Sequence, residues 1–267
     1  MKKDGHIHTP FCPHGTKDAF EKYIEKAIAH NFDEITFTEH APLPKNFIDP
    51  TPDQDSGMKE NDLLAYFQQL QQLKQSYQSQ IKINIGLEVD FIVGYEQETR
   101  DFLNTYGSYL DDAILSVHFL QRENTYDCID FSEEVYLNFA EKVGGIQCMY
   151  TQYYETVKRS IDADLGPFKP KRIGHPTLIH KFQLAHNETI DDGQQIEMLL
   201  LHMKNKGYEL DLNSAGLSKP FCKEPYPPFK SIHYAHSIQL PLVFGSDAHT
   251  VKDLHQHFHT ITEKLNF

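Results

Sequence analysis

The segment that decides the fold is Ile81-Lys82-Ile83-Asn84-Ile85-Gly86-Leu87-Glu88. Its apolar residues recur at alternate positions, which predicts a half-buried β-strand. The segment ends in the carboxylate of Glu88, and a carboxylate at such a place is rarely buried without a positively charged partner. The pattern therefore predicts a strand whose carboxyl end carries a side chain that binds a cation.

The same arrangement recurs along the chain, because five further strand-like segments also end in a histidine or a carboxylate. These segments are Gly5-His6-Ile7-His8, Thr38-Glu39-His40, Ser116-Val117-His118, Gly174-His175 and Ser246-Asp247-Ala248-His249. If the strands are parallel, all these side chains meet at one end of a sheet or barrel, where α/β folds place their active sites. A cluster of imidazoles and carboxylates at that place predicts a metal centre with several ions.

Strand-like and helical segments alternate throughout the chain, which predicts right-handed βαβ units and a parallel sheet. Strands are expected at 6–9, 34–40, 81–88, 113–119, 172–175, 208–213 and 241–245. Helices are expected at 16–31, 61–79, 95–107, 132–164 with a break at Gly144-Gly145, 191–206, 229–237 and 251–265, and a long loop at 41–60. Ligands on the first and the seventh strand meet only if the sheet closes. We therefore predict an α/β fold, a distorted (β/α)7 barrel like the TIM barrel, as one domain over residues 1–267.

The charge balance limits the partners that the chain can bind. Its 267 residues carry 38 acidic and 25 basic side chains, for a net charge of −13, whereas a general nucleic-acid binder needs a basic face. No apolar run is long enough for a membrane span, and we expect no secretory signal. The four cysteines lack CxxC spacing, which is typical of reduced thiols. We expect a cytoplasmic protein without a nucleic-acid or membrane partner, and its oligomeric state stays open.

Two pairs of side chains strengthen the prediction of a metal centre. His6 and His8 are two residues apart on an expected strand, so both point to the same face. Asp247 and His249 repeat this spacing on the last strand. Two side chains on one face of a strand can hold the same ion, and each pair lies where the other ligands are expected.

Other metal-binding residue types carry less weight. His255, His257 and His259 fall in an expected helix, where only the first and the third share a face, so no second metal site is expected there. The thiol of Cys12 lies in the loop before His14, and we interpret it as a packing residue rather than a soft ligand.

Taken in order, the motifs resemble those of the PHP family, the polymerase and histidinol phosphatase family, over the whole chain. The matching motifs are HxH (His6, His8), the loop histidine His14, TEH (His40), GLE (Glu88), SVH (His118), GH (His175) and SDAH (Asp247, His249). The resemblance implies a distorted (β/α)7 barrel that holds three divalent transition-metal ions, which would be zinc, iron or manganese. It assigns His6, His8, Glu88 and Asp247 to one ion, Glu88, His118 and His175 to a second, and His14, His40 and His249 to a third.

The resemblance also implies an activity, that of a metal-dependent phosphomonoesterase acting on L-histidinol phosphate in histidine biosynthesis. A hydroxide bridging two ions would attack phosphorus, and Glu88, Asp247 and His249 would be the catalytic residues. Asp247 or His249 could protonate the leaving oxygen, although a ligand role alone explains both residues. Arg159 and Lys219 are candidate contacts of the phosphate group.

Three other functions fit parts of the pattern. The first is the same chemistry on another small phosphate monoester, such as a nucleotide or a sugar phosphate. The second is a barrel amidohydrolase, but no lysine stands at an expected strand end to become a bridging ligand. The third is metal storage or sensing, which is disfavoured because storage tracts are local and repetitive.

Overall fold

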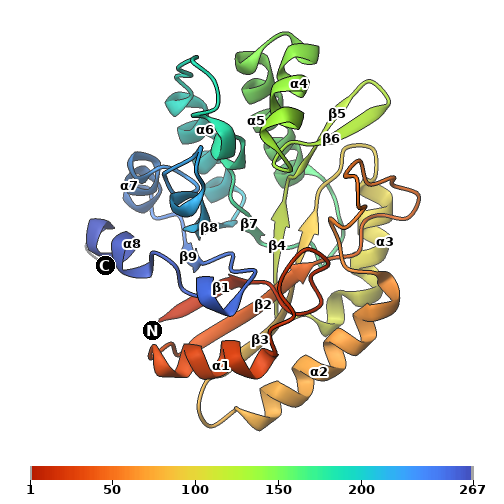
Figure 1. The fold of residues 1–267 in the computed structure, drawn as a ribbon, viewed down its shortest axis with the longest axis vertical. Coiled ribbons are helices and arrows are strands. Elements are labelled where there is room, and N and C mark those ends of the chain that lie inside the picture. Colours follow the sequence, from red (N-terminus) through yellow and green to blue (C-terminus); the bar gives the residue numbers. More distant parts are fainter. Residues whose placement is uncertain (1, 266–267) are drawn as a thin grey trace.

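The structure is a computed structural model that describes residues 2–265, and its centre is a sheet of seven parallel strands. The strands follow one another in the order β1-β2-β3-β4-β7-β8-β9. Their bounds are Lys3–Ile7 (β1), Glu34–His40 (β2), Lys82–Asp90 (β3), Asp112–Ser116 (β4), Arg172–Ile173 (β7), Glu209–Asn213 (β8) and Leu242–Gly245 (β9). Figure 1 shows the helices arranged around the outside of these strands.

The first and the last strand lie side by side, so the sheet is nearly closed into a barrel. The backbone nitrogen of Asp247 donates to the oxygen of His6 at 2.8 Å, and the nitrogen of His8 donates to the oxygen of Ala248 at 3.0 Å. Gly245 permits this approach, because a Cβ atom there would lie 2.7 Å from the Cβ atom of His6. The predicted (β/α)7 barrel is confirmed.

The helices lie close to their predicted positions, apart from the last one. Their bounds are Phe20–Ala29 (α1), Leu63–Ser76 (α2), Glu96–Tyr106 (α3), Glu133–Val143 (α4), Ile146–Asp162 (α5), Gly193–Asn205 (α6), Phe229–Ser237 (α7) and Phe258–Leu265 (α8). Short 3-10 helices are Glu60–Asp62 (η1), Gly107–Tyr109 (η2), Leu178–Phe182 (η3), Ala215–Ser218 (η4) and Val251–Asp253 (η5). Gly144 and Gly145 break the long helix as expected, with φ angles of 98° and 116°. Within the described residues, no helix is long and apolar enough to cross a membrane.

A buried arginine fills the amino-terminal end of the barrel. The guanidinium of Arg172 donates to the oxygen of Gly5 at 2.9 Å and to Oδ2 of Asp112 at 2.8 Å. Only glycine fits at position 5, because a Cβ atom there would lie 2.5 Å from Nη1 of Arg172. Nζ of Lys3 forms ion pairs with the same Asp112, 3.3 Å from Oδ2, and with Glu34, 3.1 Å from Oε1. These paired side chains fill the amino-terminal end of the barrel, opposite the carboxyl ends of the strands.

Two features differ from the sequence-based expectation. An antiparallel hairpin, Phe119–Arg122 (β5) and Thr125–Cys128 (β6), follows β4 and stands near α4 in Figure 1. The helix predicted over 251–265 is wrong in its first half, because α8 begins only at Phe258. His255 and His257 adopt positive φ angles of 62° and 58° in the preceding turn. The buried ring of His255 stacks on Phe32 instead, with ring centroids 3.5 Å apart.

Candidate metal centre

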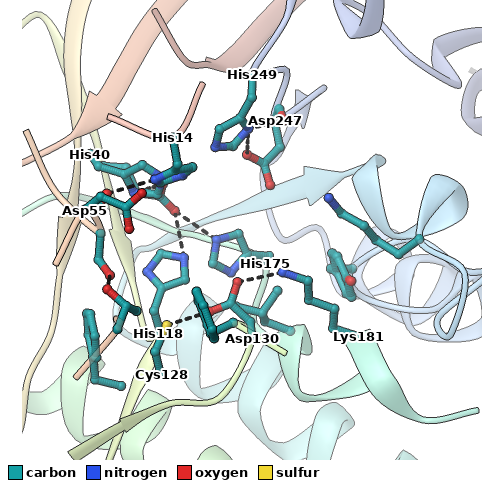
Figure 2. Close-up of a pocket in the computed structure, with 18 residues that line it drawn as sticks. His14, His40, Asp55, His118, Cys128, Asp130, His175, Lys181, Asp247 and His249 are labelled. Atoms are coloured by element: carbon teal, nitrogen blue, oxygen red, sulfur yellow. Dashed lines mark hydrogen bonds and ion pairs between the residues drawn. The ribbon is translucent and has the colours of Figure 1, made fainter. Parts of the chain in front are cut away.

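A cavity of about 370 Å³ opens at the carboxyl ends of the strands (Figure 2), and most of the predicted ligands line it. These lining ligands are His14, His40, Glu88, His118, His175, Asp247 and His249. The other two, His6 and His8, are completely buried beneath them. The structure thus brings all nine predicted side chains to one place.

Glu88, at the carboxyl end of β3, lies at the centre of the imidazoles. Its Oε2 atom lies 3.4 Å from Nε2 of His6, 3.5 Å from Nε2 of His8 and 3.2 Å from Nδ1 of His40. Its Oε1 atom faces a different pair, at 2.9 Å from Nε2 of His175 and 3.7 Å from Nε2 of His118. The two oxygens of one carboxylate therefore face two separate groups of nitrogen ligands, as in a bridging ligand.

Asp247 and His249, beyond the end of β9, complete the centre on the side of β1. Oδ1 of Asp247 lies 3.1 Å from Nε2 of His8 and 3.6 Å from Nε2 of His6. The ring of His249 stacks on that of His8, with centroids 3.8 Å apart. The ring of His14 lies 5.2 Å from the ring of His249, so the loop histidine reaches the same cluster.

Three further carboxylates accept hydrogen bonds from ring nitrogens that face away from the centre of the cluster. Asp211 accepts from Nδ1 of His6 at 2.9 Å, Glu39 from Nδ1 of His8 at 3.2 Å, and Asp90 from Nδ1 of His118 at 2.7 Å. A bond at Nδ1 leaves Nε2 as the unprotonated nitrogen, and this arrangement of carboxylate and histidine is usual around protein metal ions. The sequence reasoning missed these three acids. The strand period gave a signal for Asp90, which is two residues after Glu88 and so shares its face.

Several buried polar atoms of the centre have no hydrogen-bond partner within the described chain. They include Nε2 of His6, Nδ1 of His40 and Oε2 of Glu88. Buried polar atoms are nearly always paired, and each exception calls for an explanation such as an ion. Groups of these ligand atoms lie within 4.8 Å of one another, among them His6, His8 and Asp247, and Glu88, His118 and His175. The residues present therefore fit more than one divalent cation.

The charges in the centre shift the pKa values of its members strongly. Burial alone would lower the pKa of His8, but hydrogen bonds and charge from Asp247 and Glu39 raise it to about 9. Burial would likewise raise the pKa of Glu88, but the neighbouring imidazoles hold it well below its ordinary value. Burial and the charge of His8 together lower the pKa of His40. Burial would also raise the pKa of Asp247, but the imidazoles of His6 and His8 hold it well below its ordinary value. Glu88 and Asp247 therefore stay ionised and demand positive charge, which protons or metal ions supply.

Cys12 also lies near the centre, within 4.8 Å of ligand atoms of His8, His40 and His249. Burial and the nearby carboxylate of Glu39 raise the pKa of its thiol. A metal ligand would have to be the thiolate, and this environment favours the thiol. The burial of the thiol, which favours its protonated form, therefore supports the interpretation of Cys12 as a packing residue.

The two candidate phosphate contacts lie in different places. Lys219 lines the cavity. Arg159 does not, because it projects from the outer face of α5, where it is 57% exposed and lies 3.6 Å from Glu96. A second cavity cation, Lys181 of η3, was missed by the sequence reasoning, and it pairs with Asp130 at 2.9 Å. No sequence pattern indicates that Lys181 faces inward, since η3 is too short to show a period.

Comparison with known proteins agrees with this geometry. Residues 4–215 match the family model described as the PHP domain. A histidinol-phosphatase from Bacillus subtilis (strain 168) is 43% identical over 266 residues, which cover 99% of both chains. A crystal structure from Listeria monocytogenes, of a protein assigned as a histidinol phosphatase, is 43% identical with a TM-score of 0.92 and covers 97% of this chain and 99% of that one. A histidinol phosphate phosphatase from Lactococcus lactis, crystallised with zinc, L-histidinol and phosphate, shares the fold, with a TM-score of 0.74 at 20% identity over 98% and 93% of the two chains.

Proposed function

The chain belongs to the PHP domain family, and on that premise we propose that it is a histidinol-phosphatase, which hydrolyses L-histidinol phosphate to L-histidinol and inorganic phosphate. The observation that carries the proposal is the position of Glu88, whose two oxygens face two groups of imidazoles at the floor of a cavity. The cavity is of the size that small-molecule ligands occupy. The Bacillus subtilis relative, matched from end to end, supports the choice of substrate.

We assign the ligands to three divalent ions of zinc, iron or manganese. The first would be held by His6, His8, Glu88 and Asp247, the second by Glu88, His118 and His175, and the third by His14, His40 and His249. When bound, such ions attract a phosphate dianion and lower the pKa of water so that it becomes a nucleophile. Asp211, Glu39 and Asp90 contribute by keeping the protons of three imidazoles on Nδ1, so that Nε2 is free to bind.

The family model matches residues 4–215, but Asp247 and His249, which lie beyond that range, line the same cavity as the other ligands. We therefore propose one domain over residues 1–267.

The remaining steps fall to side chains that line the cavity. Lys219 offers its ammonium group for the phosphate oxygens, where negative charge collects in the transition state, whereas the charge of Lys181 is already paired with Asp130. Asp247 and His249 are our candidates for the group that protonates the leaving alkoxide, because both line the cavity beside the ligand cluster. Arg159 has no part in this proposal, since it lies on the outer surface.

The experiment is to measure release of inorganic phosphate from L-histidinol phosphate, sugar phosphates and nucleotides, with metal analysis of the same sample. We expect kcat/KM to be highest for L-histidinol phosphate. Comparable values for a nucleotide or a sugar phosphate would favour the alternative, a PHP phosphatase for another small monoester. Arg159→Ala is a suitable control variant, because it removes a cation that lies outside the cavity.

A further inference from the structure

The cavity contains charged side chains that the metal centre does not use. Lys181 and Asp130 neutralise each other across 2.9 Å. Asp55 and Lys219 also line the cavity, but within residues 2–265 neither the carboxylate of Asp55 nor the ammonium group of Lys219 forms a hydrogen bond or an ion pair with another side chain. One unpaired anion and one unpaired cation thus remain for a ligand.

Asp55 stands on a loop that is fastened in place. The carboxylate of Asp49 accepts from the backbone nitrogens of Thr51 and Ser56, both at 2.9 Å, and from the hydroxyl groups of the same two residues at 2.9 and 3.1 Å. Nδ1 of His14 donates to the backbone oxygen of Asp55 at 2.9 Å, which ties the loop to the metal centre. The loop therefore holds Asp55 at a fixed place, and Asp55 is the carboxylate of this loop that lines the cavity.

A free carboxylate would weaken binding in a cavity that binds only phosphate, because it repels the dianion. The same carboxylate would favour binding if the substrate also carries a positive charge. Figure 2 shows Asp55 on one side of the imidazoles, and Asp130 with Lys181 on another side. A ligand between them meets an unpaired carboxylate at one end of the cavity only.

We propose that Asp55 is a specificity-determining residue that binds the ammonium group of the substrate, while Lys219 contacts its phosphate. The substrate class is then a phosphate monoester with a cationic nitrogen close to the ester oxygen. In L-histidinol phosphate the ammonium group is attached to the carbon next to the ester carbon, so it meets this requirement, whereas sugar phosphates do not. This assignment rests on the proposed phosphatase function and narrows it.

The test compares two esters that differ only in the amine: L-histidinol phosphate and its desamino analogue, 3-(imidazol-4-yl)propyl phosphate. Asp55→Asn keeps the shape of the side chain and removes its charge. We expect kcat/KM for the amine ester to fall about tenfold to a hundredfold, chiefly through KM, because a hydrogen bond to a charged group is lost. The value for the desamino ester should stay within about twofold. Asp53→Asn is the matched control, since it removes the same charge from an exposed position on the same loop and should change neither value.

Inhibition by inorganic phosphate is an independent measurement, because phosphate lacks the amine. Asp55→Asn should not weaken this inhibition, and loss of the repelling charge should strengthen it slightly. If wild type hydrolyses both esters equally well, the recognition of the ammonium group by Asp55 is refuted and the phosphatase function stands, whereas failure to hydrolyse either ester would refute the proposed function. If wild type prefers the amine ester and Asp55→Asn keeps that preference, only the role of Asp55 is refuted. An equal loss on both esters would assign Asp55 a structural part and would overturn the inference as well.

Discussion

Replacement of His180 by glutamine should destabilise the protein in a way that depends on pH. His180 is buried in η3, and its two ring nitrogens both donate to carboxylates, Nδ1 to Glu224 and Nε2 to Asp192, each at 2.7 Å. A ring that donates from both nitrogens is a cation. Burial by itself would lower the pKa of His180, but the two carboxylates raise it to about 9. This ion group joins η3 to the loops before α6 and α7.

The size of the effect follows from that pKa. A rise from the ordinary value of 6.5 to about 9 corresponds to roughly 3 kcal/mol of stabilisation. Because the pKa in the folded state is above that in the unfolded state, this contribution is complete below about pH 6.5. It is lost as the pH rises through about 9. The free-energy difference between wild type and His180→Gln should therefore shrink by roughly 3 kcal/mol between about pH 6 and about pH 10.

Urea unfolding of both proteins at the two pH values measures this difference directly. Subtracting the variant from the wild type removes the pH effects of all other groups that both proteins share. His233→Gln, the same change at an exposed histidine of α7, should leave the free energy of unfolding nearly unchanged at both pH values. An equal destabilisation by His180→Gln at about pH 6 and about pH 10 would refute the reasoning, because it would mean that His180 acts only by packing.

Three further predictions concern the metal centre. Glu88→Gln should lower kcat at least about a hundredfold, because it keeps the shape of the bridging side chain and removes its charge, and steady-state kinetics with metal analysis of the variant will check this. Asp211→Asn should weaken metal binding by about tenfold to a hundredfold in a chelator competition, and unchanged retention would contradict the role given to the carboxylate behind His6. Removal of metal by a chelator should abolish phosphate release and lower the melting temperature, and elemental analysis of the active protein should find more than one ion per chain.

The barrel was predictable from the sequence because strand periods and strand ends are local signals. Apart from the loop histidine His14, each ligand stands at the end of a strand-like segment, and parallel strands bring such ends together whatever the details of packing. The break at Gly144-Gly145 was equally local. The hairpin of β5 and β6 was not predicted, because its strands have four residues each and are too short for a period to show.

The rest of the site depends on contacts between residues far apart in the sequence. Asp211 reaches His6 across 205 positions, so no local pattern marks it as a partner. The helical conformation predicted for His257 was wrong for a similar reason. In the turn before α8, Nε2 of His257 lies 2.7 Å from Oγ of Ser218, and tertiary packing decides this turn more than helix propensity does. Arg159 and Lys181 show the same limit, since only packing tells which cation faces the cavity.

The carboxylates around the centre bear on how many ions it needs. Five of them touch the ligand imidazoles: Glu88, Asp247, Asp211, Glu39 and Asp90. The other charged side chains of the cavity, two lysines and two aspartates, cancel. Two divalent ions would balance at most four of these five carboxylates and would leave no positive charge for a phosphate dianion, whereas three give the centre a positive charge. Inhibition by inorganic phosphate should therefore strengthen steeply as the third ion binds. The chain as a whole supplies no positive charge, since its net charge is −13. The need for positive charge at the phosphate site therefore supports a centre of three ions more directly than the count of ligands does.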